Sequence, residues 1–599
     1  IVLQKKGTLN SEEEVGLENV SVETRPPPLA EVTKELPRGF VYKPLSTPWR
    51  LALVLFVIVA LGAELFYGFA VVGQTQLKST RTLAIKNATA YMKLHGVDLE
   101  GMRSAGSLSK GILDEEMQYL FENVKLARTQ ELAQQPERPL LWSVRFFKPL
   151  QVDEYLVILD QNATPMSLGL VKPETAQGES PSQAEAQQRV EQFLTMEHPE
   201  LSGHELDDVS QTNREHRKDY SFQYQVPQYR VADAKYIASV DCIGGVVSGY
   251  DHVWQLPDKW KFERAKTSIR EQVCLYTGYA VGLICLVAML IWARGVLRAR
   301  AIPWRPAITI GIASGVIYML KNLNDLPEFF IDYETKDPLI TFYIAQAVGQ
   351  IVGAFSTFAI MAVVAAFGLA SLRLLLPNTS LSAILKTTFS PAPGVETASH
   401  RQLWIDAVLV GYAVGIGDCV LTLAFGSIKA LISPAVLVAS SLDGIAADAN
   451  VFDPAIAAMS DSIMRGFYIV FITAILVGLY AKFLHRFRNY VLFGVVTSLL
   501  GVSYYKYWQD AAIDFASYMI AFVASWFIVT RIARENILAY FLAGIAGLIA
   551  PALRLLLRYC GGVFEDDCVA LAVFLLAPAL YALLRAVGPE GKTQTIEPS

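Results

Sequence analysis

Long apolar stretches recur along most of this chain, and they constrain its fold more than any other feature of the sequence. Each approaches the ~20 residues that a helix needs to cross ~30 Å of hydrocarbon. The stretches are residues 49–73, 272–294, 306–321, 339–371, 403–424, 458–483, 488–504, 510–532, 536–556 and 568–585. They predict a mainly α, polytopic membrane protein with about ten transmembrane helices in a lipid bilayer.

One further apolar segment, 428–447, is interrupted by Ser440-Ser441 and by Asp443-Gly444. Polar residues in the middle of an apolar run argue against a full crossing. We therefore expect a re-entrant or interfacial piece in this segment.

The composition agrees with a large lipid-facing surface. Charged residues make up 18% of the chain, against about 25% in soluble domains. The formal net charge is −5, so there is no basic surplus to attract nucleic acid, and we expect no nucleic-acid partner. The six cysteines form no CxxC motif and no Cys/His cluster. We expect neither a metal site nor a cofactor.

Residues 75–265 lack any long apolar run, and the period of the pattern changes there. Apolar and polar residues alternate over 142–146 and 220–226, which is typical of half-buried strands. Further strands are expected at 155–159 and 236–240, with a hairpin turn at Gly244-Gly245. Helices are expected at about 79–95 and 182–196. Because a helix precedes strands twice, the sequence predicts an α+β domain with an internal duplication.

The chain thus divides into a polar arm (1–47), a first transmembrane helix (48–74), the inserted α+β domain (75–265), membrane helices 2–4 (266–395), a membrane core (396–590) and a short tail (591–599). Basic residues follow alternate helices, whereas the loops on the other side are acidic, as in Glu565-Asp566-Asp567. Since basic loops remain in the cytoplasm, we expect both termini to be cytoplasmic and residues 75–265 to be extracytoplasmic. The expected location is a bacterial inner membrane.

The most informative motif in the core is Ser460-Asp461-Ser462-Ile463-Met464-Arg465-Gly466. It resembles the Glu-Glu-x-x-Phe-Arg-Gly motif of the CPBP family, the CAAX prenyl protease and bacteriocin-processing membrane proteases. Ser460 and Asp461 stand where that family has its two glutamates. Two downstream segments resemble those that carry the family's histidines, with Tyr504 and Gly544 at the histidine positions. The inserted domain resembles the PepSY-type domains attached to some such proteins.

These departures decide what the resemblance implies. A glutamic-type site needs a carboxylate base and donors that stabilise an oxyanion, but no histidine follows His485. We expect a catalytically degenerate protein that binds a membrane-protein or peptide partner. Two alternatives remain open, namely an active intramembrane protease that uses Asp461, and a transporter or structural subunit of a membrane complex. In the degenerate protein, Asp461 and Arg465 would form an i, i+4 pair on one helix.

Two other acids lie in apolar runs, and charged groups in a bilayer are costly unless they are paired or functional. Glu64 is expected to pair with another helix. Asp418 is expected to be buried and to accept hydrogen bonds from a neighbouring helix, with a proton or ion path as the alternative. Cys560 and Cys568 flank a short loop that begins Gly561-Gly562, and this spacing predicts a disulfide between them.

Overall fold

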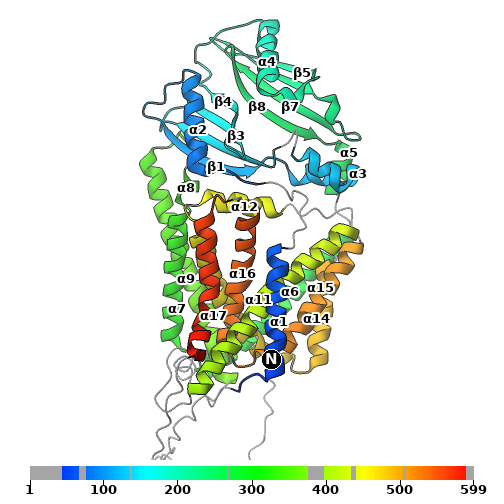
Figure 1. Cartoon of the computed structure of the whole chain (residues 1–599), viewed down its shortest axis with the longest axis vertical. Helices are drawn as coiled ribbons and strands as arrows, with labels where there is room; N and C mark the ends of the chain where they lie inside the picture. The colour runs from blue at the N-terminus through cyan, green and yellow to red at the C-terminus, as the bar shows by residue number, and fades with distance from the viewer. Residues whose placement is uncertain are drawn as a thin grey trace, which may run out of the picture.

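The computed structural model describes residues 43–66, 76–134, 138–266, 269–375, 397–432, 440–502, 508–560 and 562–587. In these ranges the chain forms a bundle of long helices with an α+β domain at one end (Figure 1). Nine of the described helices are long and apolar enough to cross a membrane. They are α1 (Thr47–Phe66), α6 (Ile269–Arg298), α7 (Trp304–Asn324), α9 (Leu339–Leu375), α11 (Thr397–Ile432), α13 (Pro454–Phe483), α15 (Trp508–Phe527, continued by the π-helix η4, Ile528–Ile532), α16 (Ile537–Tyr559) and α17 (Glu565–Val587). The chain is a mainly α, multi-pass membrane protein.

The remaining predicted crossing, 488–504, corresponds to α14 (Phe487–Val502), which has only 16 residues and packs against α15. The predicted first helix, 49–73, corresponds to α1. Residues 67–75 lie outside the described part of the chain, as do most of the predicted arm and all residues after α17.

The α+β domain has two halves with the same order of elements. The first half contains α2 (Arg81–Leu94) and an antiparallel sheet of β1 (Arg103–Lys110), β2 (Leu140–Phe147), β3 (Glu154–Asp160) and β4 (Pro165–Val171). The second contains α4 (Gln183–Glu197) and an antiparallel sheet of β5 (Glu205–Asn213), β6 (Lys218–Gln225), β7 (Lys235–Ile243) and β8 (Val246–Gln255). The helix-then-strands order thus occurs twice, as the sequence predicts. The first half also has α3 (Asp114–Leu132), between β1 and β2.

Local chemistry accounts for these elements. Alternate residues of β2, among them Trp142 and Val144, are fully buried. The predicted hairpin turn is present, because Ile243 pairs with Val246 and leaves a two-residue loop. Gly244 and Gly245 adopt φ values of +56° and +85°, which glycine tolerates without steric cost.

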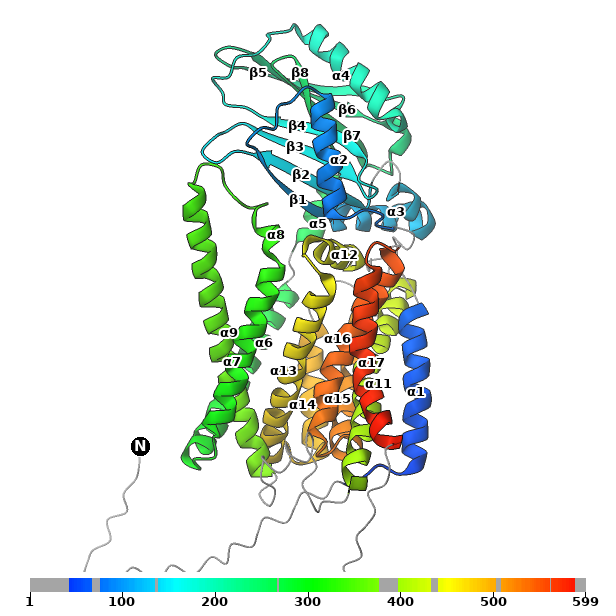
Figure 2. The same ribbon diagram turned by 60° about the vertical axis from the view of Figure 1, so that its left-hand side comes forward.

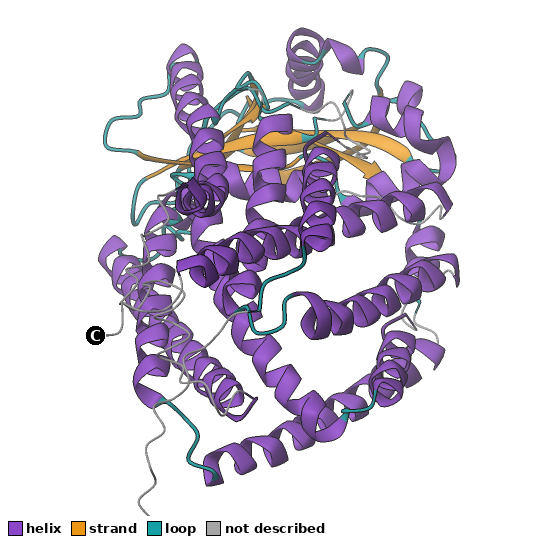
Figure 3. Cartoon of the chain, turned by 60° about the horizontal axis from the view of Figure 1, so that its bottom comes forward, coloured by secondary structure: helices purple, strands orange, loops and turns teal. Residues whose placement is uncertain are grey.

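Helix α16 is the central helix of the C-terminal part of the bundle, and it packs against α1, α11, α13 and α17. Its contact with α11 depends on small residues. A Cβ atom added at Gly411 would lie 2.7 Å from the Leu542 Cβ, and one at Gly415 would lie 2.7 Å from the Gly547 amide nitrogen. Glycines therefore allow the two backbones to approach closely, as is common between membrane helices. Figure 3 shows the bundle obliquely, with the end opposite the domain turned toward the viewer.

The domain contacts the bundle through the short helix α12 (Ser440–Asn450), which lies across the domain-side ends of the long helices (Figures 1 and 2). The buried Asn450 side chain accepts a hydrogen bond from the Leu108 amide (2.7 Å) and donates one to the Leu108 carbonyl (3.0 Å). Asn450 thus holds α12 against β1. This helix lies at the end of the predicted interfacial piece, of which residues 433–439 are outside the described ranges.

A second contact is made by the loop between α8 (Leu326–Phe329) and α9. Arg145 of β2 pairs with Glu154 of β3 at 2.6 Å and also donates to the Tyr333 carbonyl at 2.6 Å. The Thr335 hydroxyl donates to Glu154, and the Leu150 amide donates to the Thr335 carbonyl. Burial raises the pKa of Glu154, but the hydrogen bonds from Arg145 and Thr335 outweigh it and leave the pKa below its usual value.

Candidate functional site

Helix α13 carries the whole motif from Ser460 to Gly466, and it begins at a capped N-terminus. The Asp453 side chain accepts a hydrogen bond from the Ile456 amide. About two turns beyond Asp453, both oxygens of Asp461 accept hydrogen bonds of 2.8 Å from the Lys321 ammonium of α7. The predicted i, i+4 pair of Asp461 with Arg465 is therefore wrong. The neighbouring helix supplies a cation that can contact both carboxylate oxygens.

Arg465 instead reaches α16, where it donates a hydrogen bond of 3.0 Å to the Gly547 carbonyl. In a regular helix that carbonyl would accept from the amide four residues on. Here the residue is Pro551, which has no N–H. The Cys419 thiol of α11 donates to the same carbonyl at 3.2 Å. Two side chains from other helices thus replace the hydrogen bond that Pro551 removes.

Asp418 lies beside this contact, but it is not buried as predicted. Its side chain is 63% exposed within the protein, and its nearest cation is the Arg465 guanidinium at 3.8 Å. Asp418 lies toward the end of the contact between α11 and α16, which reaches Cys419 but is absent at Gly426, where an added Cβ atom would meet nothing within 4 Å. The carboxylate therefore faces the space beside α13.

Glu64 of α1 is fully buried and lies 3.4 Å from the Arg554 guanidinium of α16. This pairing of Glu64 with another helix matches the prediction. Both Glu64 oxygens lack a hydrogen-bond donor among the described residues, so the pair is held by charge alone. Glu64, Asp418, Arg465 and Arg554 all lie within electrostatic range of Cys419. The four charges form an intramembrane cluster drawn from α1, α11, α13 and α16.

The other motif positions that the structure describes, Gly544 and Ser460, are packed within the helix bundle. A Cβ atom added at Gly544 would lie 2.6 Å from both the Cα and the amide nitrogen of Gly466. At this position α16 and α13 are in close backbone contact, and Gly544 supplies no side-chain group. Ser460 is buried on α13. Tyr504 lies outside the described residues.

The two cysteines of the predicted disulfide are both buried free thiols in the structure, at the end of α16 and in the first turn of α17. Burial, together with the nearby Asp448 carboxylate, raises the pKa of Cys560 to about 12. A bond between Cys560 and Cys568 stays a prediction.

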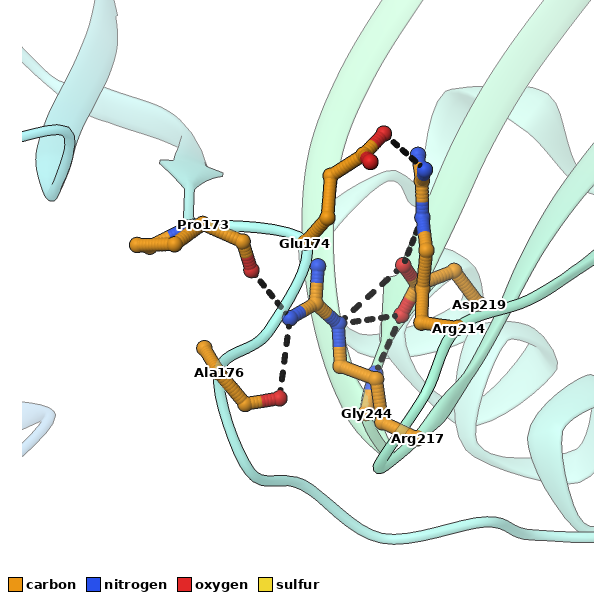
Figure 4. Close-up of polar contacts among 7 residues, drawn as sticks. All are labelled: Pro173, Glu174, Ala176, Arg214, Arg217, Asp219 and Gly244. Atoms are coloured by element: carbon orange, nitrogen blue, oxygen red, sulfur yellow. Dashed lines mark hydrogen bonds and ion pairs between the residues drawn. The ribbon is translucent and has the colours of Figure 1, made fainter.

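The polar cluster of the α+β domain shown in Figure 4 is structural. The Arg217 guanidinium donates to both oxygens of Asp219 (3.0 and 3.1 Å) and to the Pro173 and Ala176 carbonyls (2.6 and 3.0 Å). Asp219 also accepts from the Gly244 amide. This network fastens the linker between the two halves of the domain to the β7–β8 hairpin.

Sequence reasoning missed the cations that pair with the acids. Lys321, Arg554 and Arg50 lie far along the chain from Asp461, Glu64 and Asp406, respectively. Each of these basic residues lies in or beside an apolar run. That position alone could have indicated that the residue pairs with an acid. Choosing the partner requires knowledge of which helices are neighbours.

The fold and the cluster together define a multi-pass membrane protein with an α+β domain at one end and paired charges inside its helix bundle. Comparison with protein-family models, with curated proteins and with solved structures finds no match for this chain. The resemblance to the CPBP family therefore depends on the motif residues alone.

Proposed function

We propose that this protein is a catalytically degenerate relative of the CPBP proteases, which binds a membrane-protein or peptide partner without hydrolysing it. The observation that carries the proposal is the Lys321–Asp461 pair. A general base must be oriented toward the water molecule that it activates. Both oxygens of Asp461 accept hydrogen bonds from the Lys321 ammonium, and Asp461 is the only carboxylate at the motif positions.

The surroundings of Asp461 give the same proposal further support. The two positions that carry histidine in the family hold Tyr504 and Gly544, and Gly544 is occupied in helix packing. Losing one oxyanion donor typically costs about 10²–10³ in rate. Losing acid–base help costs roughly 10²–10⁴ more. A membrane region with one engaged carboxylate suits binding better than catalysis.

The proposal includes an orientation, with both termini in the cytoplasm and the α+β domain outside, in a bacterial inner membrane. It is supported by Arg298, Arg373 and Lys482, which end α6, α9 and α13. Those ends point away from the domain (Figure 2). The domain would then meet partners outside the cell membrane.

Cleavage assays test the absence of hydrolysis. The purified protein is incubated in proteoliposomes with a transmembrane peptide, and products are read by mass spectrometry. We expect no turnover from the wild type or from Asp461→Asn. Steady cleavage by the wild type that Asp461→Asn abolishes, with the helix content unchanged, would replace the proposal by an active protease. The Asp98→Asn variant, which alters an exposed domain residue, is the matched control.

A transporter is the second candidate, and the buried Glu64–Arg554 pair favours it. Ionisable groups in the membrane interior often belong to ion or proton paths. The measurement that separates the two candidates is proton or solute flux in sealed proteoliposomes, which a binding protein would not support.

A further inference from the structure

Four charged side chains on the membrane helices are partly or mostly exposed in the structure. The Lys321 and Asp461 side chains are 34% and 43% exposed, and those of Arg465 and Asp418 are 41% and 63% exposed. They come from α7, α13 and α11. Such exposure is ordinary at a water-facing surface. Within a hydrocarbon layer, it requires water or a polar ligand next to the charges.

The charges descend from the domain side toward the middle of the bundle. Lys321 stands in the last turn of α7, next to the domain. Asp461 and Arg465 lie seven and eleven residues after Pro454, the first residue of α13. At 1.5 Å per residue, these two lie ~10 and ~16 Å along the helix from its domain end. Asp418 lies across from Arg465. Arg465 and Asp418 thus lie well below the domain-side end of α13. The short side chain of Asp418 cannot extend from this depth to the membrane surface.

The course of α11 explains why space opens at Asp418. At Gly411 and Gly415, α11 is in close contact with α16. Further along, its Lys429 pairs with Asp514 of α15 at 2.6 Å, so the helix has turned toward α15. Figure 1 shows the slant of α11 relative to α16. Positions 411, 415, 418 and 422 share one helical face. Asp418 and Thr422 therefore continue the face that meets α16. The contact with α16 persists at Cys419, which reaches the Gly547 carbonyl at 3.2 Å, but at Gly426 an added Cβ atom would meet nothing within 4 Å.

We propose that this wedge, bounded by α11 on one side and by α13 and α16 on the other, is a water-filled inlet open toward the domain side, and that Asp418 is its binding group for an ammonium or other small organic cation. The Asp418 carboxylate is mostly exposed, and Arg465 approaches it only to 3.8 Å. The Arg465 guanidinium is directed to the Gly547 carbonyl at 3.0 Å. Asp418 thus retains lone pairs for a ligand. The inference does not depend on the proposed function.

Cysteine accessibility tests the inlet. Thr422→Cys places a thiol one turn beyond Asp418, on the face toward the wedge. Ala424→Cys is the matched control, since it is also exposed but lies about 200° around the same helix. Both variants are made with Cys419→Ser, reconstituted in proteoliposomes and treated with a quaternary-ammonium methanethiosulfonate on both faces of the membrane. Mass spectrometry then measures the modification of the residue 402–429 peptide.

We expect Thr422→Cys to react about tenfold faster than Ala424→Cys or more, because the charged reagent does not enter hydrocarbon. Adding Asp418→Asn should slow the cationic reagent several-fold and leave a sulfonate reagent unslowed. Equal rates at 422 and 424, or no reaction at 422 while a denatured sample reacts fully, would overturn the inlet. Reaction without any effect of Asp418→Asn would overturn the cation site. If Thr422→Cys does not fold, Ala457→Cys, one turn before Asp461 on α13, replaces it with the same expectations.

Discussion

At the scale of single residues, the motif positions serve packing and pairing. Arg465 lies where the CPBP motif has its arginine, and here it satisfies the Gly547 carbonyl that Pro551 leaves free. A buried carbonyl without a donor costs about 1–3 kcal/mol. The arginine and the proline are therefore linked across two helices, and this link can be tested without knowing the partner.

We predict that Pro551→Ala stabilises Arg465→Met more than it stabilises the wild type, by about 1 kcal/mol. Alanine at 551 restores an N–H four residues beyond Gly547, which replaces the donor that Arg465→Met removes. Reversible unfolding in mixed detergent micelles gives the four free energies of the double-mutant cycle. Pro578→Ala in α17 is the control, and its effect should be the same with and without Arg465. Equal effects of Pro551→Ala in both backgrounds would contradict the link.

At the residue level, the sequence could predict that a charged residue in an apolar run needs a partner, but it could not predict which residue that partner is. That Glu64 would need a partner follows from its place in an apolar run. That Asp461 would choose Lys321 over Arg465 does not follow, because the i, i+4 rule covers only one helix. Asp418 was expected to be buried, and its exposure results from the divergence of α11 and α16, which no local pattern contains.

At the scale of elements, helices and strands were largely predictable, because apolar length and period-two alternation are local properties. Helix α3 was missed. Its sequence is polar, with three acids in the first turn, and lacks the clear apolar stripe of α2 or α4. The closeness of α13 to α16 was also invisible, since Gly466 and Gly544 each look like an isolated glycine until the helices are placed together.

We predict that Gly544→Ala destabilises the protein by about 1–3 kcal/mol, the usual cost of overpacking. The added Cβ would lie 2.6 Å from the Gly466 backbone, so one helix must move. Gly426→Ala in α11 is the matched control, because a Cβ there meets nothing within 4 Å. Because Gly426→Ala replaces a glycine inside a helix, it should stabilise the protein by at most about 1 kcal/mol. Thermal unfolding of both variants decides, and a neutral Gly544→Ala would contradict the close contact.

At the scale of the whole molecule, α12 joins the domain to the bundle. Asn450 binds β1 through both ends of its amide, and the Arg81 guanidinium of α2 donates to the Asn450 carbonyl. Asp448 lies two residues earlier in the same helix. Burial and the nearby Asp567 carboxylate raise the pKa of Asp448 to about 7. Packing of α12 thus favours the protonated form of this side chain.

The last prediction is that the packing of α12 weakens as the pH rises through about 7, and that Asp448→Asn removes this dependence. When α12 is released, Asp448 returns toward its ordinary pKa of 3.8. Since the packed state has the raised pKa, its stability is fully present below pH 3.8 and is lost as the pH rises through 7. The measurement is hydrogen exchange of the α12 and β1 amides, corrected for intrinsic rates, between pH 6 and pH 8, an interval that brackets the Asp448 pKa of about 7. In the wild type, exchange should become faster as the pH rises across this interval. Asp448→Asn should keep the slow rate throughout. Asp98→Asn should behave as the wild type does. An unchanged pH profile in Asp448→Asn would show that other groups control how the domain is held.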